Sequence, residues 1–232
     1  MNALVFSDID GTITPEITLF PVYDALAADG FIINDDNERV QDTLCAFEAG
    51  ETDYSTFMAN ALDRAAEAIR GRESFQAKQL AREYVSSTLG FFLWVPQTFD
   101  DVRGSDGEIV LVTGEPDFIA EPIAGRFGAS FFSTQLGKDT DGKYTGEVVL
   151  ALGSSQKASR VKRKIAHTQM NRTVYAFGDS EGDIGMLDLA NPAGNAFCIN
   201  PDDELRAHAQ ANAMTIVDEP NIARSLLSTS IN

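Results

Sequence analysis

The sequence predicts an α/β fold, a doubly wound parallel sheet with a small α-helical bundle as a second part. Short apolar runs alternate with helical segments after residue 96, and strands separated by helices form parallel sheets covered on both faces. Residues 19–89 instead are rich in Ala, Glu and Arg with almost no strand pattern, which predicts the bundle. A chain of 232 residues has room for one large domain with a smaller insertion.

The first apolar run ends in two acids one residue apart, Asp8 and Asp10, with Gly11 directly after them. An extended chain alternates its side chains, so both carboxylates are expected on the same side of a strand. Two carboxylates this close repel each other unless a divalent cation such as Mg²⁺ neutralises them. Taken alone, the pair is equally typical of a solvated turn, so both interpretations stay open at this point.

Residues 19–89 predict four amphipathic helices, because apolar residues recur there at every third or fourth position. The expected helices are Phe20–Ala28, Arg39–Ala49, Tyr54–Ile69 and Phe75–Val85. Breaks and N-caps are expected at Asn34, at Asp35 and within Gly50–Asp53. Since this helical segment follows the first strand and precedes all others, we expect an inserted cap domain.

The rest of the chain alternates strands and helices. The expected strands are Glu108–Thr113, Ala129–Thr134, Arg172–Phe177, Ala196–Asn200 and Met214–Val217. The expected helices are Asp117–Phe127, Gln156–Ala166 and Glu204–Ala211. A hairpin is expected over Leu136–Leu150, because Asp141-Gly142 at its centre is typical of a tight turn. We therefore expect a core domain formed by residues 1–18 and 90–232, with the cap at 19–89.

The formal net charge of -17 comes from 35 acids against 18 bases. Nucleic acids and anionic membranes attract cationic surfaces, so neither is expected as a partner. No run approaches the roughly 18–20 apolar residues that span a bilayer, and no basic segment precedes the first apolar run as in a signal peptide. A cytoplasmic protein is expected. Adaptation to high salt and an ordinary acidic surface both explain the charge, and the sequence does not indicate an oligomeric state.

The cysteines and histidines show no metal-binding spacing. Cys45 and Cys198 form no Cys-x-x-Cys pair, which predicts reduced thiols in or near the core. His167 and His208 have no His or Cys partner at ligand spacing, so zinc is not expected.

Further polar residues follow the expected strands. Thr113-Gly114 ends one strand, Asp179 and Asp183 follow another, and Lys157 begins the basic helix between them. Each alone has an ordinary interpretation as a turn, a helix N-cap or a solvated lysine. Since ligands bind beyond the carboxyl ends of parallel strands, their occurrence in this order favours one shared site with Asp8 and Asp10.

These residues resemble the motifs of the haloacid dehalogenase superfamily, in particular its branch of phosphoserine phosphatases. The matching segments are Asp8-Ile-Asp10-Gly-Thr12, Val112-Thr113-Gly114, Lys157 and Gly178-Asp179 through Asp183. The helical insert stands at that branch's cap position, and the hairpin around Asp141-Gly142 is also similar. The resemblance implies a Rossmann-like core with a helical cap and a phosphatase that acts on a small phosphorylated metabolite.

The resemblance also implies a role for each residue. Asp8 would attack phosphorus and form an aspartyl-phosphate, and Asp10 would carry the proton. Mg²⁺ would be held by Asp8, Asp179 and the carbonyl of Asp10, with Asp183 binding or orienting that group. Charge on the phosphoryl oxygens would be stabilised by Thr113, Gly114 and Lys157.

Two alternatives keep the same residues. A phosphotransferase would pass the phosphoryl group to an acceptor alcohol, and a regulatory module would bind phosphate without catalysis. A dehalogenase is disfavoured because it would need neither Asp10 nor the second acidic pair. Phosphoserine-specific members commonly carry Ser at the position of Gly11 and Asn at that of Gly182, so the metabolite stays open. Glu16 is a candidate substrate contact, with Arg64, Arg70 and Arg72 as candidate partners.

Overall fold

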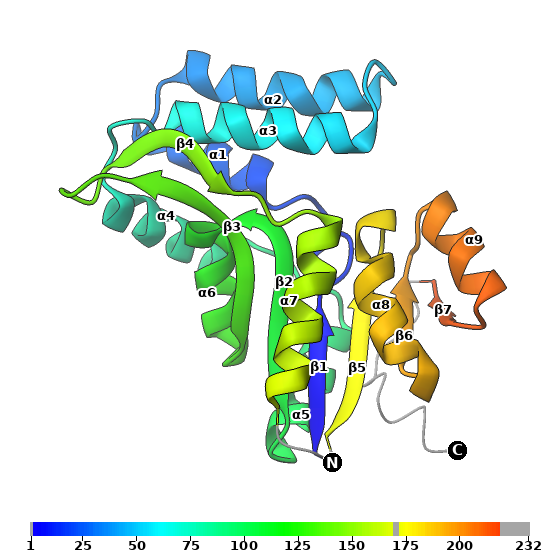
Figure 1. Ribbon diagram of the computed structural model, residues 1–232. Coiled ribbons are helices and arrows are strands. Elements are labelled where there is room, and N and C mark those ends of the chain that lie inside the picture. Colours follow the sequence, from blue (N-terminus) through cyan, green and yellow to red (C-terminus); the bar gives the residue numbers. More distant parts are fainter. Residues whose placement is uncertain (1, 169–171, 219–232) are drawn as a thin grey trace.

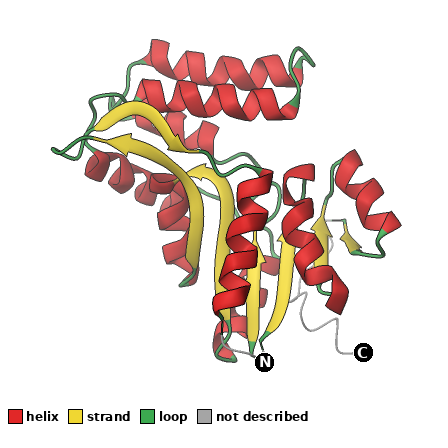
Figure 2. Ribbon diagram, viewed as in Figure 1, coloured by secondary structure: helices red, strands yellow, loops and turns green. Residues whose placement is uncertain are grey.

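The computed structural model describes residues 2–168 and 172–218, which form a seven-stranded sheet with helices on both faces (Figures 1 and 2). The strand order is β4-β3-β2-β1-β5-β6-β7, and every neighbouring pair is parallel except β3 and β4. The strands are β1 (Ala3–Ser7), β2 (Glu108–Pro116), β3 (Ser130–Lys138), β4 (Tyr144–Leu150), β5 (Thr173–Gly178), β6 (Ala196–Ile199) and β7 (Thr215–Val217). The predicted α/β class is confirmed.

The first strand shows why the sheet is covered twice. Ala3 and Val5 belong to one hydrophobic cluster, while Leu4 and Phe6 belong to a second cluster on the opposite face. Alternate residues of a strand point to opposite faces, so a continuous apolar run needs helices on both sides. The chain runs outward from β1 through β2 and β3 to β4 and then returns through α7 to β5, on the other side of β1. The carboxyl ends of β1 and β5 therefore form a topological switch point, where such folds bind ligands.

Helices cover both faces of the sheet, and α2 and α3 lie beyond one end of it (Figure 1). The helices are α1 (Leu19–Ala28), α2 (Asn34–Glu48), α3 (Tyr54–Ala68), α4 (Ser74–Ser87), α5 (Trp94–Gly104), α6 (Asp117–Phe127), α7 (Ser154–His167), α8 (Ile184–Ala190) and α9 (Asp203–Ala211). All seven helices expected from periodicity are confirmed, with ends that differ by a few residues.

Helices α5 and α8 were not among the expected helices. Pro96 is the third residue of α5, in the first turn, where a helix needs no N–H donor. Trp94 and Phe99 of this helix are completely buried. Apolar burial therefore outweighs the local signal of the proline.

Two boundary predictions were wrong. The strand expected to end at Thr134 and the first arm of the expected hairpin are one continuous strand, β3, whose first half pairs with β2 and second half with β4. The expected caps Asn34 and Asp35 are the first residues of α2, and Ile33 is its N-cap. Asp35 stabilises that helix from its first turn, where a negative charge opposes the positive end of the helix dipole.

The predicted cap region packs closely on the core. Helices α2 and α3 pair with each other, α3 contacts β4, and α4 contacts α6. One hydrophobic cluster runs from Phe57 and Ala61 of α3 to Trp94 and Phe118 of the core. The division into a cap at 19–89 and a core at 1–18 and 90–232 stays a prediction, and residues 169–171 and 219–232 of that core lie outside the described residues.

Helix α3 begins at an N-cap that the sequence predicted. Asp53 accepts hydrogen bonds from the Thr56 N–H (2.9 Å), the Thr56 hydroxyl (2.9 Å) and the Ser55 hydroxyl (2.8 Å). The hydrogen bond from the Thr56 backbone leads these in lowering the pKa of Asp53 to about 2. A carboxylate at this position satisfies N–H groups that the first helical turn leaves free.

Replacing Asp53 with Ala is expected to lower the melting temperature at pH 7, while Asp53→Asn keeps most of the stability because Asn also caps helices. The lowered pKa means that ionised Asp53 stabilises the fold above its unfolded pKa of 3.8, and that this stability is lost as pH falls through about 2. Melting curves from pH 7 to pH 2 check this. A difference between Asp53→Ala and wild type that does not narrow below pH 4 would contradict it.

The remaining composition-based expectations concern thiols and membranes. Both cysteines are free, as predicted. Cys198 is buried in β6, where burial raises the pKa of its thiol to about 12, whereas Cys45 is exposed and the expectation that it lies near the core was wrong. Among the described residues, no helix combines the length and apolar character needed to span a membrane.

Candidate active site

Strand β1 delivers Asp8 to the carboxyl edge of the sheet. The strand ends at Ser7, and the backbone N–H of Asp8 donates to the Phe177 carbonyl at the end of β5 (3.0 Å). Asp8 is 5% exposed and lines a cavity of about 400 Å³. Its position therefore follows from the pairing of the two central strands.

A tight loop, not strand alternation, places Asp10. The Ile9 carbonyl accepts the N–H groups of Ile13 (2.7 Å) and Thr14 (3.0 Å), so the chain turns back directly after Asp8. Oδ1 of Asp10 then accepts from the Thr18 N–H (2.7 Å) and hydroxyl (2.6 Å). The expectation of one extended strand through both acids was wrong, because the strand ends before the first of them.

Gly11 makes this loop possible. Its φ of +72° lies in the left-handed region that favours glycine. A Cβ atom here would also lie 2.2 Å from Oδ2 of Asp179. The structure thus brings the first acidic pair against the acid that follows β5, and any side chain at position 11 would have to displace the Asp179 carboxylate.

Lys157 joins the two acidic pairs. Its Nζ lies 2.8 Å from Oδ1 of Asp8 and 2.8 Å from Oδ1 of Asp183, and its side chain comes from the first turn of α7. Burial lowers the pKa of Lys157, but the charges of Asp183 and Asp8 outweigh this and hold that pKa well above its usual value. The lysine is therefore a permanent cation in this centre.

The second acidic pair completes the cluster. Oδ1 of Asp179 accepts from the Thr12 hydroxyl (2.9 Å), and Oδ2 of Asp183 accepts from the Asp179 N–H (3.2 Å). One carboxylate oxygen each of Asp8, Asp179 and Asp183 lie within 4.8 Å of one another. In the described part of the chain, no other such group of His, Cys, Asp or Glu occurs.

The carboxylates outnumber the one cation among them. Burial, with the charges of Asp183 and Asp10, raises the pKa of Asp8 to about 8 although Lys157 opposes the shift. Burial and the charges of Asp183 and Asp8 raise the pKa of Asp179 well above its usual value. Converging carboxylate oxygens with excess negative charge suit a hard divalent cation such as Mg²⁺. The donor set therefore fits the predicted metal.

The predicted metal ligands differ in their surroundings. The Asp10 carboxylate is not part of the converging group and bonds with Thr18, which leaves its backbone carbonyl as the candidate ligand. Both oxygens of Asp183 already accept hydrogen bonds, from Lys157 and from the Asp179 N–H. This occupancy favours an orienting role for Asp183.

The predicted phosphate-binding residues lie at an irregularity in β2. Val112 pairs with Phe132 and Pro116 with Thr134, so the β2 residues 113–115 stand opposite a single β3 residue. Gly114 lines the cavity beside Asp8 and Lys157. The Thr113 hydroxyl is buried and accepts from the Glu115 N–H (3.0 Å), which leaves its own proton free to donate.

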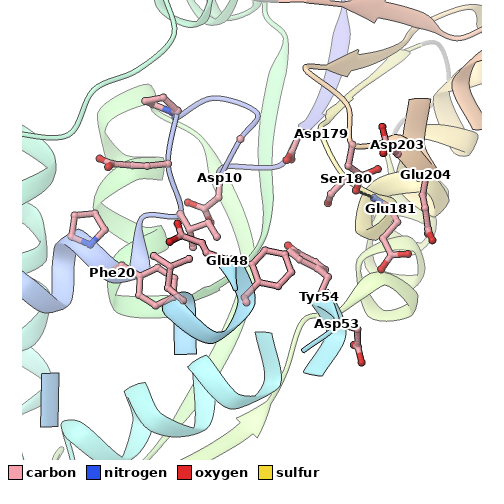
Figure 3. Close-up of a pocket in the computed structure, with 18 residues that line it drawn as sticks. Asp10, Phe20, Glu48, Asp53, Tyr54, Asp179, Ser180, Glu181, Asp203 and Glu204 are labelled. Atoms are coloured by element: carbon pink, nitrogen blue, oxygen red, sulfur yellow. Dashed lines mark hydrogen bonds between the residues drawn. The ribbon is translucent and has the colours of Figure 1, made fainter. Parts of the chain in front are cut away.

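A second cavity of about 740 Å³ adjoins the first. Asp10, Ile17, Tyr54, Ser180 and Glu181 line both of them. Figure 3 shows Asp10, Phe20 and Tyr54 facing this second cavity, with Asp179, Glu181 and Glu204 along its rim. The group bound to a leaving oxygen near Asp10 can therefore extend into either cavity.

The sequence did not indicate that one face of α3 and Glu115 belong to the site. Tyr54, Met58 and Leu62 of α3 line the first cavity opposite Asp8, but at helical spacing they look like ordinary core residues. Glu115 is a buried acid in an apolar strand, which was an available signal. Its pKa lies well above the usual value because of burial and the neighbouring Asp10.

The fold and the site define an enzyme of the doubly wound α/β type, with carboxylates and one buried lysine at the switch point. A model of the haloacid dehalogenase-like hydrolase family matches residues 5–188, and the chain belongs to that family. The predicted resemblance to its phosphoserine-phosphatase-like members is confirmed, as is the expectation of a hydrolase.

The chain is also similar to individual known proteins. Phosphoserine phosphatase SerB1 of Mycobacterium tuberculosis is 26% identical over 222 residues, 94% of this chain and 71% of that protein. A protein of unknown function from Bordetella pertussis has a TM-score of 0.72 at 22% identity, covering 94% of this chain and 99% of that one. A phospho-aspartyl intermediate analogue of phosphoserine phosphatase has a TM-score of 0.63 at 16% identity, covering 99% and 97%. These structures are similar to the chain in fold.

Proposed function

We propose that the chain is a Mg²⁺-dependent phosphatase that hydrolyses small phosphomonoesters through an aspartyl-phosphate on Asp8. The observation that carries this proposal is the contact of Asp8 with the buried Lys157 beside Asp10, at the wall of a cavity of about 400 Å³. Family membership and the similarity to phosphoserine phosphatase SerB1 support it.

The first step transfers the phosphoryl group to Asp8. One oxygen of Asp8 accepts from Lys157, and the other attacks phosphorus. As this bond forms, the bond from phosphorus to the alcohol oxygen breaks with its electron pair, and Asp10 donates a proton to the departing oxygen. Lys157 and the Gly114 N–H stabilise negative charge on the phosphoryl oxygens.

The second step releases phosphate. Water attacks phosphorus, the bond to Asp8 breaks, and Asp10 takes the proton from the water. The same carboxyl thus returns to its starting protonation state. Two hydrogen bonds from Thr18 hold Asp10 in place for both transfers.

Asp8 and Asp179, oriented by Asp183, would hold Mg²⁺, together with the carbonyl of Asp10. When bound, the ion offsets the repulsion between the carboxylates and the phosphate. Three converging carboxylate oxygens and an excess of negative charge support this assignment.

Replacing Gly11 with Ala is expected to weaken Mg²⁺ binding at least about tenfold, because the new methyl group displaces Asp179. The Mg²⁺ concentration that gives half-maximal phosphate release measures this. Gly30→Ala is the matched control, since Gly30 has a similar φ of +78° but no atom within 4 Å of the added Cβ. An equal Mg²⁺ requirement for both variants would contradict the displacement of Asp179.

The charge of the cavities suggests the class of substrate. Among the described residues that line the two cavities, Lys157 is the one cation, and it already pairs with two carboxylates. The candidate partners for a substrate carboxylate lie elsewhere: Arg64 lines other clefts, Arg70 pairs with Glu67, and Arg72 stacks on Phe31. Monoesters without a second negative charge are therefore the proposed substrates.

Phosphate release from a panel of monoesters, with Mg²⁺ or with EDTA, tests the proposed function. Release that requires the metal supports it, and release that chelation leaves unchanged overturns it. A new phosphoester formed when acceptor alcohols are added would instead favour a phosphotransferase. Binding of phosphate with neither release nor transfer would favour the regulatory module.

One matched pair in the panel tests the substrate class. 2-Aminoethyl phosphate is O-phosphoserine without the carboxylate. Its kcat/KM is expected to exceed that of O-phosphoserine by about tenfold or more, because the cavities offer the carboxylate no free cation. A preference for O-phosphoserine would overturn this assignment of substrate class while leaving the phosphatase intact.

A further inference from the structure

Glu115 is a buried carboxyl that no step of the proposed reaction uses. It lies in β2 directly after Gly114 and is 2% exposed. Its Oε1 accepts from the backbone N–H of Leu19 (3.0 Å), the first residue of α1. Its Oε2 has no N–H or hydroxyl partner among the described residues. Burying a carboxyl oxygen without a hydrogen-bond donor costs free energy.

The start of α1 brings Glu115 to Asp10. Thr18 donates its N–H to Asp10, and the next residue, Leu19, donates its N–H to Glu115. Consecutive N–H groups at the end of one helix are close together, so the two carboxyls that accept them are neighbours. The Asp10 and Glu115 side chains accordingly interact with each other.

This arrangement replaces ordinary helix capping. The Thr18 side chain makes no capping hydrogen bond, and the first turn of α1 contains no acid. The free N–H groups of this helix are instead satisfied by carboxyls from the core, one of which is the proposed proton carrier. The proton carrier and the first cap helix therefore share one set of contacts.

We propose that Glu115 is a positioning residue, which holds the carboxyl of Asp10 and the first turn of α1 in the arrangement needed for proton transfer to the leaving group. The inference rests on the proposed function. Without Glu115, the Leu19 N–H loses its acceptor and Asp10 loses the neighbour that limits its rotation. Misplacement of a reacting group by about 1 Å can cost on the order of 10²-fold in rate.

The test compares substrates that differ in their need for protonation. An alkyl phosphate loses an alkoxide that must be protonated, whereas 4-nitrophenyl phosphate loses a stable phenolate. Since kcat/KM covers the steps up to departure of the alcohol, Glu115→Leu is expected to lower kcat/KM by about 10²-fold for the alkyl phosphate and by less than about tenfold for 4-nitrophenyl phosphate.

The conservative variant separates positioning from other roles. Gln has the same shape, can accept from Leu19 and can donate to Asp10, so Glu115→Gln is expected to stay within about threefold of wild type on both substrates. Glu115→Asp, one methylene shorter, should resemble Glu115→Leu and serves if the Leu variant does not fold. Tyr23→Phe is the control for general disturbance of α1, because it removes only the hydrogen bond from Tyr23 to the Ala65 carbonyl.

Four results would overturn the inference: equal losses on both substrates, selective loss on 4-nitrophenyl phosphate, a Glu115→Gln variant as impaired as Glu115→Leu, or a fully active Glu115→Leu. Absence of Mg²⁺-dependent release by wild type on every substrate would instead overturn the proposed function itself.

Discussion

Asp8→Asn is expected to abolish phosphate release, lowering kcat by at least about 10⁴-fold. An amide is too weak a nucleophile to attack phosphorus, and the rest of the site loses only one negative charge. The amide oxygen can still accept the hydrogen bond from Lys157, which in wild type is 2.8 Å long. We therefore expect a folded protein without turnover.

Two measurements make this result specific to the nucleophile. Acid quenching of wild type during turnover of a phosphate-labelled substrate should leave label on the protein, and Asp8→Asn should acquire none. Asp100→Asn removes an exposed carboxylate that pairs with Arg103 on α5, and it should keep full activity. Covalent labelling of Asp8→Asn, or turnover above about a hundredth of wild type, would contradict the assignment of Asp8.

Predictions from the sequence were most accurate for features that depend on residues close together in the chain. The apolar run Ala3–Ser7 and the three- and four-residue spacing of α1 and α3 each reflect burial along one element, and the structure contains all of them. Asp53 was predictable as an N-cap for the same reason, since its partners lie within three residues. Because the carboxyl ends of parallel strands lie at one edge of the sheet, the order of these elements also predicted that Asp8, Lys157 and Asp179 lie close together.

These predictions were wrong or incomplete where residues distant in the chain determine the extent of a helix or strand. Helix α5 was not predicted, and burial of Trp94 and Phe99 stabilises it although Pro96 lies in its first turn. The turn signal at Asp141-Gly142 was correct, yet only pairing with both β2 and β4 makes β3 one long strand.

The place of Glu115 in the site depends on contacts that cannot be predicted from the sequence. Its hydrogen-bond partner, Leu19, is 96 positions away. The orientation of the Asp10 side chain likewise depends on hydrogen bonds from Thr18. Thr18 lies beside Asp10 only because the loop after β1 is tight. The chemistry of the site was therefore predictable from residue types in order, while the hydrogen bonds that orient each group were not.

Lys157→Met is expected to have a large effect on both stability and activity. Lys157 is 7% exposed and is the cation between Asp8 and Asp183. Removing one partner from a buried ionic group leaves the others uncompensated, which typically costs about 3–5 kcal/mol. The unfolding free energy of the metal-free protein at pH 8 should fall by about this amount. Loss of charge stabilisation on the phosphoryl oxygens should lower kcat/KM by at least about 10²-fold.

The pH dependence of this loss follows from Asp8. Its pKa in the folded protein is already about 8, above the ordinary 3.8, and removing Lys157 raises it further. A carboxyl with a raised folded pKa destabilises the fold increasingly as pH rises from its unfolded pKa through its folded one. Asp8 is therefore ionised in wild type but still protonated in the variant just above about pH 8, so the stability difference between Lys157→Met and wild type should grow as pH rises from about 7 to about 9.5 and level off below about pH 7. Lys162→Met, an exposed change on the same helix, should show neither effect. A pH-independent difference would mean that the lysine stabilises α7 through packing alone and that its charge does not balance the carboxylates of the site.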